Sequence, residues 1–549
     1  MDKVKELLEL SKEELDERKK VRKDYYYFLG KCKDKDKALN DEALLGQSWV
    51  VSDNLDYVPT QDIRNKVKSL LKKQARFMFG KAPNILFKPY KKEDKESCEE
   101  LRQFIDDILE ENNFFSETLK AFLMCSVEKR VLLRLEANPK QPINLCYHKI
   151  KDFSYKKEGR NLKSFTIVIQ DKNTLGKEDK DKIYYRYTYY MPEANDINKK
   201  ENGENKKTSC HLKIETFKGD RFDKNKPSKV VVRDTLLSKI PGFVIVNGGL
   251  LGNKFGESDL EDLKDAQNLY NKRISDFGDA LRFQMFGQTV IIDATEGTVN
   301  NAKIAPNGLL PLQSIDEEGK KADAKILESS FSSAEPIEMY LKRAEHDMRE
   351  ALDMPEESNL KDIPSAKALK YMYNDLIARC EEKWNDWENP IKQLIRLIIE
   401  SCSKFECYPG WDKKWDNLKF RIVLKHNYPL PQDEEDKKRL AIEEVNSNVR
   451  SHRSYIKDYS NEEDVDGAIN EIVEDIKTIA SAEQDQFQKS LEYELNDENT
   501  NDIDDDNTKN NNNNNKNPDF DTKKDKNVTK NHNKNTKNNK KNNVDDING

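Results

Sequence analysis

The 549-residue sequence lacks long apolar runs. No window approaches the roughly 18 uninterrupted apolar residues that a membrane-spanning helix requires, so no membrane span is expected. Positive charge is not in surplus either: 95 Lys and Arg stand against 102 Asp and Glu, for a net charge of -7. This excludes a global cationic field for gripping nucleic acid. The opening stretch MDKVKELLEL is charged and amphipathic, unlike a secretory signal, so the eight cysteines are expected to be reduced.

Catalytic and metal-binding motifs are also missing. The sequence contains no G-x-S-x-G, no H-E-x-x-H and no phosphate-loop motif. Cys402 and Cys407, followed by His426, come nearest to metal-ligand spacing, but no second ligand pair follows them. Buried cysteines are the favoured interpretation. We therefore expect no enzymatic activity, no bound cofactor and no metal.

A glycine-rich stretch, residues 247–256, invites comparison with a phosphate-binding loop. That loop requires G-x-x-x-x-G-K-[ST], whereas here Lys254 precedes Gly256. Carboxylates at Glu257 and Asp259 would repel phosphate, yet they suit the positive end of a helix dipole without any ligand. We interpret the glycines as a flexible entry into a helix.

Helical periodicity is abundant. Amphipathic patterns predict helices over residues 2–28, 61–79, 98–112 and 114–128. The strongest pattern covers 257–286, with Ser258 as the expected cap and Glu261 as its capping-box partner. Its apolar stripe comprises Leu260, Leu263, Tyr270, Ile274, Phe277 and Leu281.

Between about residues 130 and 246 the period changes to two, which predicts a β-rich meander. Its expected strands are VLLRLEA, SFTIVIQD, KIYYRYTYYM, CHLKIETF and KVVVRDTLL. Farther on, QTVIID and KFRIVLKHNYPLP also read as strands. Alternating helical and strand-rich segments indicate an α+β protein.

The C-terminal half adds further helices. One is expected from Pro336 to Leu352, and another from Ser365 to a kink or break at Pro390, after which it resumes. Two more cover about 432–457 and 461–488. From about Asn496 the chain is rich in Asn, Lys and Asp, with a single aromatic residue, so disorder is expected there.

The order of these parts resembles the portal proteins of tailed bacteriophages and of prophages of Gram-positive bacteria. GESDLEDLKDAQNLYNKRISDFGDALRFQMFGQTVIID is similar to the first stem helix of that family running into the clip, and RNKVKSLLKKQARFMFGKAPNILF to its N-terminal segment. SAKALKYMYNDLIARCEEKW resembles the helix after the tunnel loop, and VRSHRSYIKDYSNEEDVDGAINEI resembles the crown. The likeness covers roughly residues 20–490.

The resemblance implies a portal architecture. A wing of helices and β-meander is joined to a two-helix stem, a small β-containing clip and a helical crown, and a disordered tail follows. The implied parts are the wing 1–255, stem helices 256–286 and 336–352, clip 287–335, tunnel loop 353–365, a long kinked helix and wing strand 366–431, crown 432–490 and tail 491–549.

The resemblance also implies a function and partners. About twelve copies would form a ring at one capsid vertex of the virion, after assembly in the bacterial cytoplasm. Double-stranded DNA would pass through the ring during packaging and ejection, without sequence recognition. The implied partners are the terminase large subunit, a head-completion adaptor, and the major capsid and scaffold proteins; no membrane is involved.

The charge pattern agrees with a conduit. From Glu257 to Gln284 there are seven acidic and four basic residues, and a wall that conducts DNA should not hold its phosphates. Lys272, Arg273, Arg282 and Lys361 could touch phosphates, although ordinary solvated or inter-subunit charges are the alternative. The expected channel residues are Glu261, Asp265, Lys272, Asp276 and Asp279 in the stem, and Glu356, Glu357, Asn359, Lys361 and Asp362 in the tunnel loop.

Two other functions remain open at this point. A scaffolding or interaction protein of another large assembly, with no DNA passage, would share the helical stripes and the missing active site. A nucleic-acid-processing enzyme would need a carboxylate cluster or a phosphate loop, neither of which the sequence offers.

Overall fold

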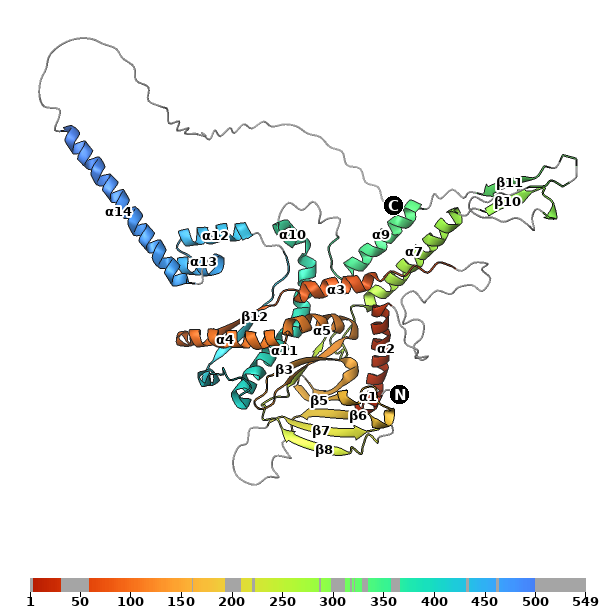
Figure 1. The fold of residues 1–549 in the computed structure, drawn as a ribbon, viewed down its shortest axis with the longest axis horizontal. Helices are drawn as coiled ribbons and strands as arrows, with labels where there is room; N and C mark the ends of the chain where they lie inside the picture. Colours follow the sequence, from red (N-terminus) through yellow and green to blue (C-terminus); the bar gives the residue numbers. More distant parts are fainter. Residues whose placement is uncertain are drawn as a thin grey trace, which may run out of the picture. The chain divides into compact units, whose positions relative to one another are not determined.

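The computed structural model describes residues 3–30, 59–159, 161–192, 209–219, 223–285, 288–297, 312–315, 318–319, 321–327, 334–356, 366–430, 434–460 and 464–498. The chain divides into two compact units, Met1–Glu434 and Glu435–Gly549. Helices and strands are both well represented, which confirms the α+β class (Figure 1).

The helices of the first unit are α1 (Lys3–Leu7), α2 (Lys12–Leu29), α3 (Lys66–Phe79), α4 (Lys95–Glu111), α5 (Phe114–Glu128), α7 (Lys264–Met285), α9 (Ala334–Glu350), α10 (Ala366–Met372) and α11 (Asn374–Phe405). Its strands are β1 (Asn84–Pro89), β2 (Arg130–Glu136), β3 (Asn144–Lys149), β4 (Phe153–Glu158), β5 (Asn161–Gln170), β6 (Ile183–Tyr190), β7 (His211–Lys218), β8 (Lys229–Asp234), β9 (Gly242–Val246), β10 (Gln288–Ile292), β11 (Asp323–Leu327) and β12 (Phe420–Lys425).

The predicted meander is present as an antiparallel sheet with strand order β4-β5-β6-β7-β8 (Figure 1). Along β5, Phe165 and Ile167 are fully buried, while Thr166 between them faces the opposite side and bonds Thr188 of β6. This alternation is why the period-two signal was strong. The first predicted strand, β2, belongs instead to a second sheet, β3-β2-β9, because nearly all of it is buried on both faces.

The main core surrounds α11. Trp384 and Trp387 pack against Phe79 of α3, and Trp387 also packs against Phe122 of α5. Of the kink or break predicted at Pro390, the break does not occur, because α11 continues through the proline. An interior proline costs about 3 kcal/mol, which burial of the long apolar face of α11 outweighs.

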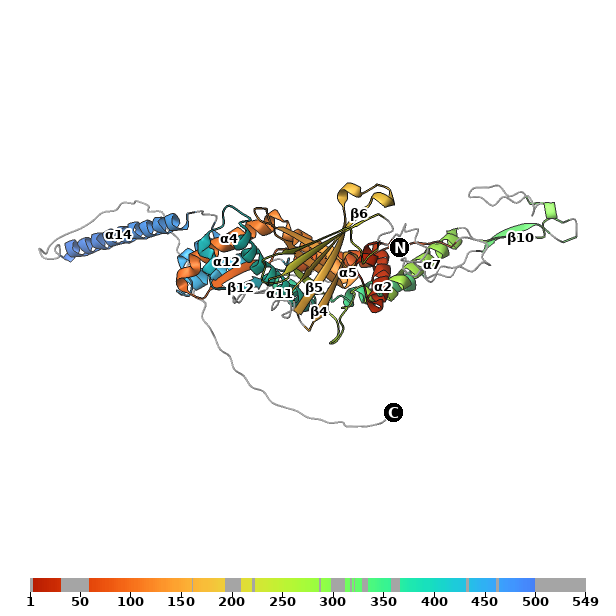
Figure 2. The same cartoon turned by 90° about the horizontal axis from the view of Figure 1, so that it is seen from below.

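Helices α7 and α9 lie side by side, and the β10–β11 ribbon follows α7 in the chain (Figures 1 and 2). Helix α9 matches its prediction, but α7 begins seven residues later than expected, at Lys264 rather than 257. The Ser258 capping box is not formed. The Ser258 hydroxyl instead donates to the carbonyls of Ser126 and Val127, and thereby fixes a buried turn before the helix.

Three other predicted helices differ from the structure: two are interrupted, and one begins later than expected. The helix predicted over 2–28 is interrupted at Glu9, where φ is +52°, and restarts at the N-cap Ser11. Residues 61–65 are extended, because tertiary hydrogen bonds hold them. The helix predicted over 432–457 is two helices, with Asn448 at φ +57° between them.

The second unit contains α12 (Glu434–Asn446), α13 (His452–Tyr459) and α14 (Val465–Glu498). Ala441, Val445 and Ile456 are its buried apolar residues among those described. Helix α14 continues beyond residue 491, where the tail was expected to begin. The rest of the predicted tail, residues 499–549, lies outside the described residues.

Candidate functional site in the α7–α9 helix pair

One face of α7 carries four buried polar side chains at intervals of four residues. We call this set the polar ladder; its members are Gln267, Asn271, Ser275 and Asp279. Spacing of four residues places them above one another along the helix. Gln267 and Asn271 are completely buried, and Asp279 is only 9% exposed. Because buried polar groups require hydrogen-bond partners, the ladder must be bound to something.

Its partner is the backbone of an extended segment, residues 59–65, which we call the strap. The Thr60 N–H donates to both carboxylate oxygens of Asp279, at 2.9 and 3.1 Å. The Asp62 N–H donates to Ser275 Oγ at 2.8 Å, and the Arg64 N–H donates to Asn271 Oδ1 at 3.1 Å. In an extended chain, the N–H groups of every second residue point to the same side. Two strap residues span about the same distance as one turn of α7, so each of these N–H groups meets one member of the ladder.

Gln267 is the last member of the ladder, and its side chain binds the first amides of helix α3. Its Oε1 accepts from the N–H groups of Lys66 and Val67, at 2.9 and 3.1 Å, while its Nε2 donates to the Arg64 carbonyl. The first amides of α3, which lack partners within their own helix, are therefore capped in part by a side chain of α7. This contact joins α7 to the α3 core.

The expected channel residues of α7 divide into two groups. Asp265, Lys272 and Asp276 are exposed, and Asp276 pairs with Arg273 at 3.2 Å. Glu261 is also exposed, although it lies in the turn before the helix. Asp279 differs from the expectation of an open charge, because the strap covers it.

The expected tunnel loop is described only at its first residues. Glu356 Oε1 lies 2.6 Å from His346 Nδ1 of α9, and Asp353 lies 3.2 Å from Arg379 of α11. These contacts fix the exit from α9. The other expected loop residues, Glu357, Asn359, Lys361 and Asp362, lie outside the described residues.

A buried ionic network holds the entry to α7. The Lys383 ammonium of α11 donates to Asp259 Oδ1 and to Asn247 Oδ1, both at 2.8 Å. Asn247 also donates to the Glu257 carbonyl, and so closes the glycine-rich stretch into a loop. Gly256 has φ +76°, and a Cβ there would meet Val246 at 2.6 Å. At this position glycine serves close packing as well as entry into the helix.

The outward faces of the helix pair expose large apolar side chains. Met339 is 65% exposed, and three others are exposed by about two-fifths. These three are Leu269, Leu281 and Tyr340. Ala344 and Met348, by contrast, are buried on the inner face of α9. The helix pair therefore has apolar surface that the described part of the chain leaves exposed.

Most of the described cysteines, and His148 among the histidines, occupy buried packing positions. Cys402 and Cys407 are buried, as expected, and burial raises the pKa of the Cys380 thiol to about 12. His148 is held neutral, with its pKa lowered by burial and by Arg134 to about 4. Within the described ranges no cluster of three His, Cys, Asp or Glu side chains could hold a metal ion, and no helix could cross a membrane.

The polar ladder is the feature that sequence reasoning missed. The spacing of residues 267, 271, 275 and 279 was visible, but a polar stripe on a helix ordinarily faces solvent. Nothing in this spacing distinguishes a polar stripe that accepts backbone amides from one that faces water.

The comparisons with known proteins agree with the resemblance seen in the sequence. No curated protein matches the chain. A family model described as phage portal protein, SPP1 Gp6-like, matches residues 8–489, which include every helix and strand from α2 to β12 as well as α12 and α13. The chain therefore belongs to this family of phage portal proteins.

Proposed function

We propose that about twelve copies of the chain form a ring at one capsid vertex and that double-stranded DNA passes through it during packaging and ejection. Family membership supports a portal role. The observation that carries the ring is the exposed apolar surface of the helix pair α7–α9. In a ring, each pair has a neighbour on both sides, and those neighbours would remove this surface from water.

Helix α14 supports the same assembly from the second unit. Its isoleucines repeat at intervals of three and four residues and are exposed, as is a phenylalanine two turns on. The residues concerned are Ile472, Ile476, Ile479 and Phe487. A helix with such a stripe is stabilised when copies of it pack together. We assign α12–α14 to the crown.

The charge on α7 supports passage of DNA rather than capture. Five of the seven acidic residues between Glu257 and Gln284 are exposed, and two are bound within the protein, Asp259 by Lys383 and Asp279 by the strap. We propose that Glu261, Asp265 and Asp276 give the channel wall its acidic character, with Lys272 as an isolated cation. Few phosphates would then be neutralised, so the duplex would slide.

The remaining parts follow the portal order. We assign residues 1–255 to the wing, α7 and α9 to the stem, the β10–β11 ribbon to the clip, and residues 353–365, with Lys361, to the tunnel loop. The clip is the proposed docking site for the terminase large subunit and later for the head-completion adaptor. The major capsid and scaffold proteins are the proposed partners around the wing. No enzymatic step is assigned to the chain.

Negative-stain imaging and native mass spectrometry of the purified full chain test this proposal. We expect rings of about twelve copies with a central hole. Met339→Asp together with Leu281→Asp places charges on the exposed apolar faces and should reduce the ring fraction strongly. Lys342→Asp on an exposed position of α9 is the control. Monomers or dimers of the unaltered chain would reject the ring, and closed particles without a hole would favour the scaffolding alternative.

A further inference from the structure

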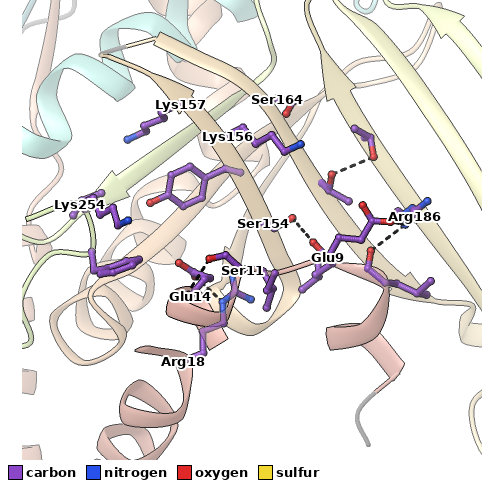
Figure 3. A pocket seen from close by; sticks show the side chains of 18 of the residues that line it. Glu9, Ser11, Glu14, Arg18, Ser154, Lys156, Lys157, Ser164, Arg186 and Lys254 are labelled. Atoms are coloured by element: carbon purple, nitrogen blue, oxygen red, sulfur yellow. Dashed lines mark hydrogen bonds and ion pairs between the residues drawn. The ribbon is translucent and has the colours of Figure 1, made fainter. Parts of the chain in front are cut away.

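A cavity of about 920 Å³ lies between the α1–α2 turn and one face of the five-stranded sheet (Figure 3). The turn contributes Glu9, Ser11 and Glu14, and the strands contribute serine, threonine and charged side chains. This volume falls within the range of small-molecule sites, roughly 300–1,000 Å³. The proposed portal function assigns no role to this cavity.

Two consecutive lysines of β4, Lys156 and Lys157, line this cavity. The strand register shifts beside them, where Lys163 is an extra residue in the neighbouring strand β5. Lys254, from the glycine-rich loop, also lines the cavity (Figure 3).

The arginines that line the cavity are already bound to carboxylates. Arg18 pairs with Glu14 at 2.7 Å, and Arg186 pairs with Glu215 at 2.7 Å and with Glu9 at 2.8 Å. These pairs neutralise one another, so they hold the α1–α2 turn against the sheet and leave little net charge.

The lysines differ. Lys156 and Lys157 have no carboxylate partner among the described residues. Lys254 pairs only with the exposed Glu13, and an exposed pair contributes at most about 1 kcal/mol. Burial and the nearby Arg130 lower the pKa of Lys157, which indicates a cation without a compensating charge. One further carboxylate, Asp386, lines the cavity and accepts a hydrogen bond from the Gly248 N–H. The three lysines outnumber it, so they give the cavity its surplus positive charge.

We propose that the cavity binds a phosphate-bearing small molecule, with its phosphate at Lys156, Lys157 and Lys254. An ammonium group is a compact point charge that suits the tetrahedral phosphate, whereas planar carboxylates are better matched by guanidinium groups, which here are occupied. The hydroxyl of Ser164, beside the lysines in Figure 3, supplies a neutral donor. The volume of the cavity, about 920 Å³, suits a small ligand rather than a DNA duplex.

Isothermal titration of the full chain with pyrophosphate and with ATP tests the site. We expect saturable binding that weakens with salt, and a loss of affinity of about tenfold or more in Lys156→Gln/Lys157→Gln. Lys229→Gln, an exposed lysine of β8 in the same sheet, should bind as the unaltered chain does. Unchanged far-ultraviolet circular dichroism would show that both variants are folded.

Three results would overturn the proposal: no binding to the unaltered chain, binding that survives the double substitution, or displacement of pyrophosphate by an equal phosphate concentration of duplex DNA. Binding by pyrophosphate but not ATP would support the phosphate site and limit the ligand to smaller molecules. Each cavity belongs to one chain, so binding is expected whether or not rings form. Failure here would leave the proposed portal function unaffected.

Discussion

At the scale of single residues, the first unit contains charges that are buried and satisfied by one another. Lys383 is one of them, since its ammonium lies 2.8 Å from both Asp259 and Asn247. Removing one member of a buried pair leaves the other charge without compensation. Such residues decide stability even where they take no part in function.

Lys383→Met should lower the free energy of unfolding by about 3 kcal/mol, because the Asp259 carboxylate would keep the neutral donor Asn247 but, among the described residues, only the more distant cation Arg379, at 3.6 Å. Urea denaturation followed by tryptophan fluorescence measures the change. Lys392→Met, in the same helix, removes a partly exposed pair with Glu388 and should cost less than about 1 kcal/mol. Equal losses in the two variants would contradict the importance given to the buried network.

Glu128 makes stability depend on pH. It is buried, and burial raises its pKa from 4.5 to about 7. The folded state therefore holds the proton more tightly than the unfolded state, and stability falls as pH rises from about 4.5 to about 7.

Glu128→Gln should remove this dependence. Relative to that variant, the unaltered chain should lose about 3 kcal/mol of unfolding free energy between pH 4.5 and pH 8, as the pKa shift implies. Denaturation curves at the two pH values measure the difference. Glu117→Gln, on the exposed face of the same helix, should leave the pH dependence unchanged. A parallel response of Glu128→Gln and the unaltered chain would refute the assignment.

At the scale of elements, the strap and the polar ladder connect α7 to α3. Gln267→Ala removes the acceptor for the Lys66 and Val67 amides, and buried unpaired amides cost about 1–3 kcal/mol. Hydrogen exchange should therefore become at least roughly tenfold faster across residues 60–67. Asp276→Asn, on the exposed face of α7, is the control. Unchanged exchange in Gln267→Ala would show that the strap is held by other contacts.

The elements also show what sequence patterns can and cannot predict. Alternation along β5 to β8 and the amphipathic faces of α4, α5 and α9 located these elements correctly, because one buried face leaves a period in the sequence. Strand β1, only six residues long, was missed; it pairs with the predicted strand β12, more than 300 residues along the chain. The strap was misread as helix because its hydrogen bonds come from α7, about 200 residues along the chain.

The candidate site was predicted less completely than the fold. Exposure of Asp265, Lys272 and Asp276 agrees with open charges, but periodicity alone did not separate them from Asp279. In a sequence, an aspartate that accepts hydrogen bonds from backbone amides cannot be told apart from one that faces water. Only the three-dimensional course of the strap distinguishes the two.

At the scale of the whole molecule, the described fold ends with α14 at Glu498. The composition of residues 499–549 offers almost no apolar surface for packing. Deleting these residues should leave the ring fraction and copy number unchanged, as measured by native mass spectrometry. Deletion from Val465 onward, which removes α14 and its exposed stripe, is the contrasting variant and should reduce assembly. Loss of rings in the shorter deletion would mean that the tail takes part in association.

The polar ladder has a consequence for how the chain can diverge. The ladder accepts hydrogen bonds from the backbone N–H groups of Thr60, Asp62 and Arg64 in the strap. Every amino acid except proline has such an N–H group. In related proteins the side chains of the strap are therefore expected to vary almost freely, except that proline is excluded at the three donor positions. Sequence variation is constrained instead on the helix, at Gln267, Asn271, Ser275 and Asp279. An apolar residue at any of these positions would leave the opposite backbone N–H without a hydrogen-bond acceptor.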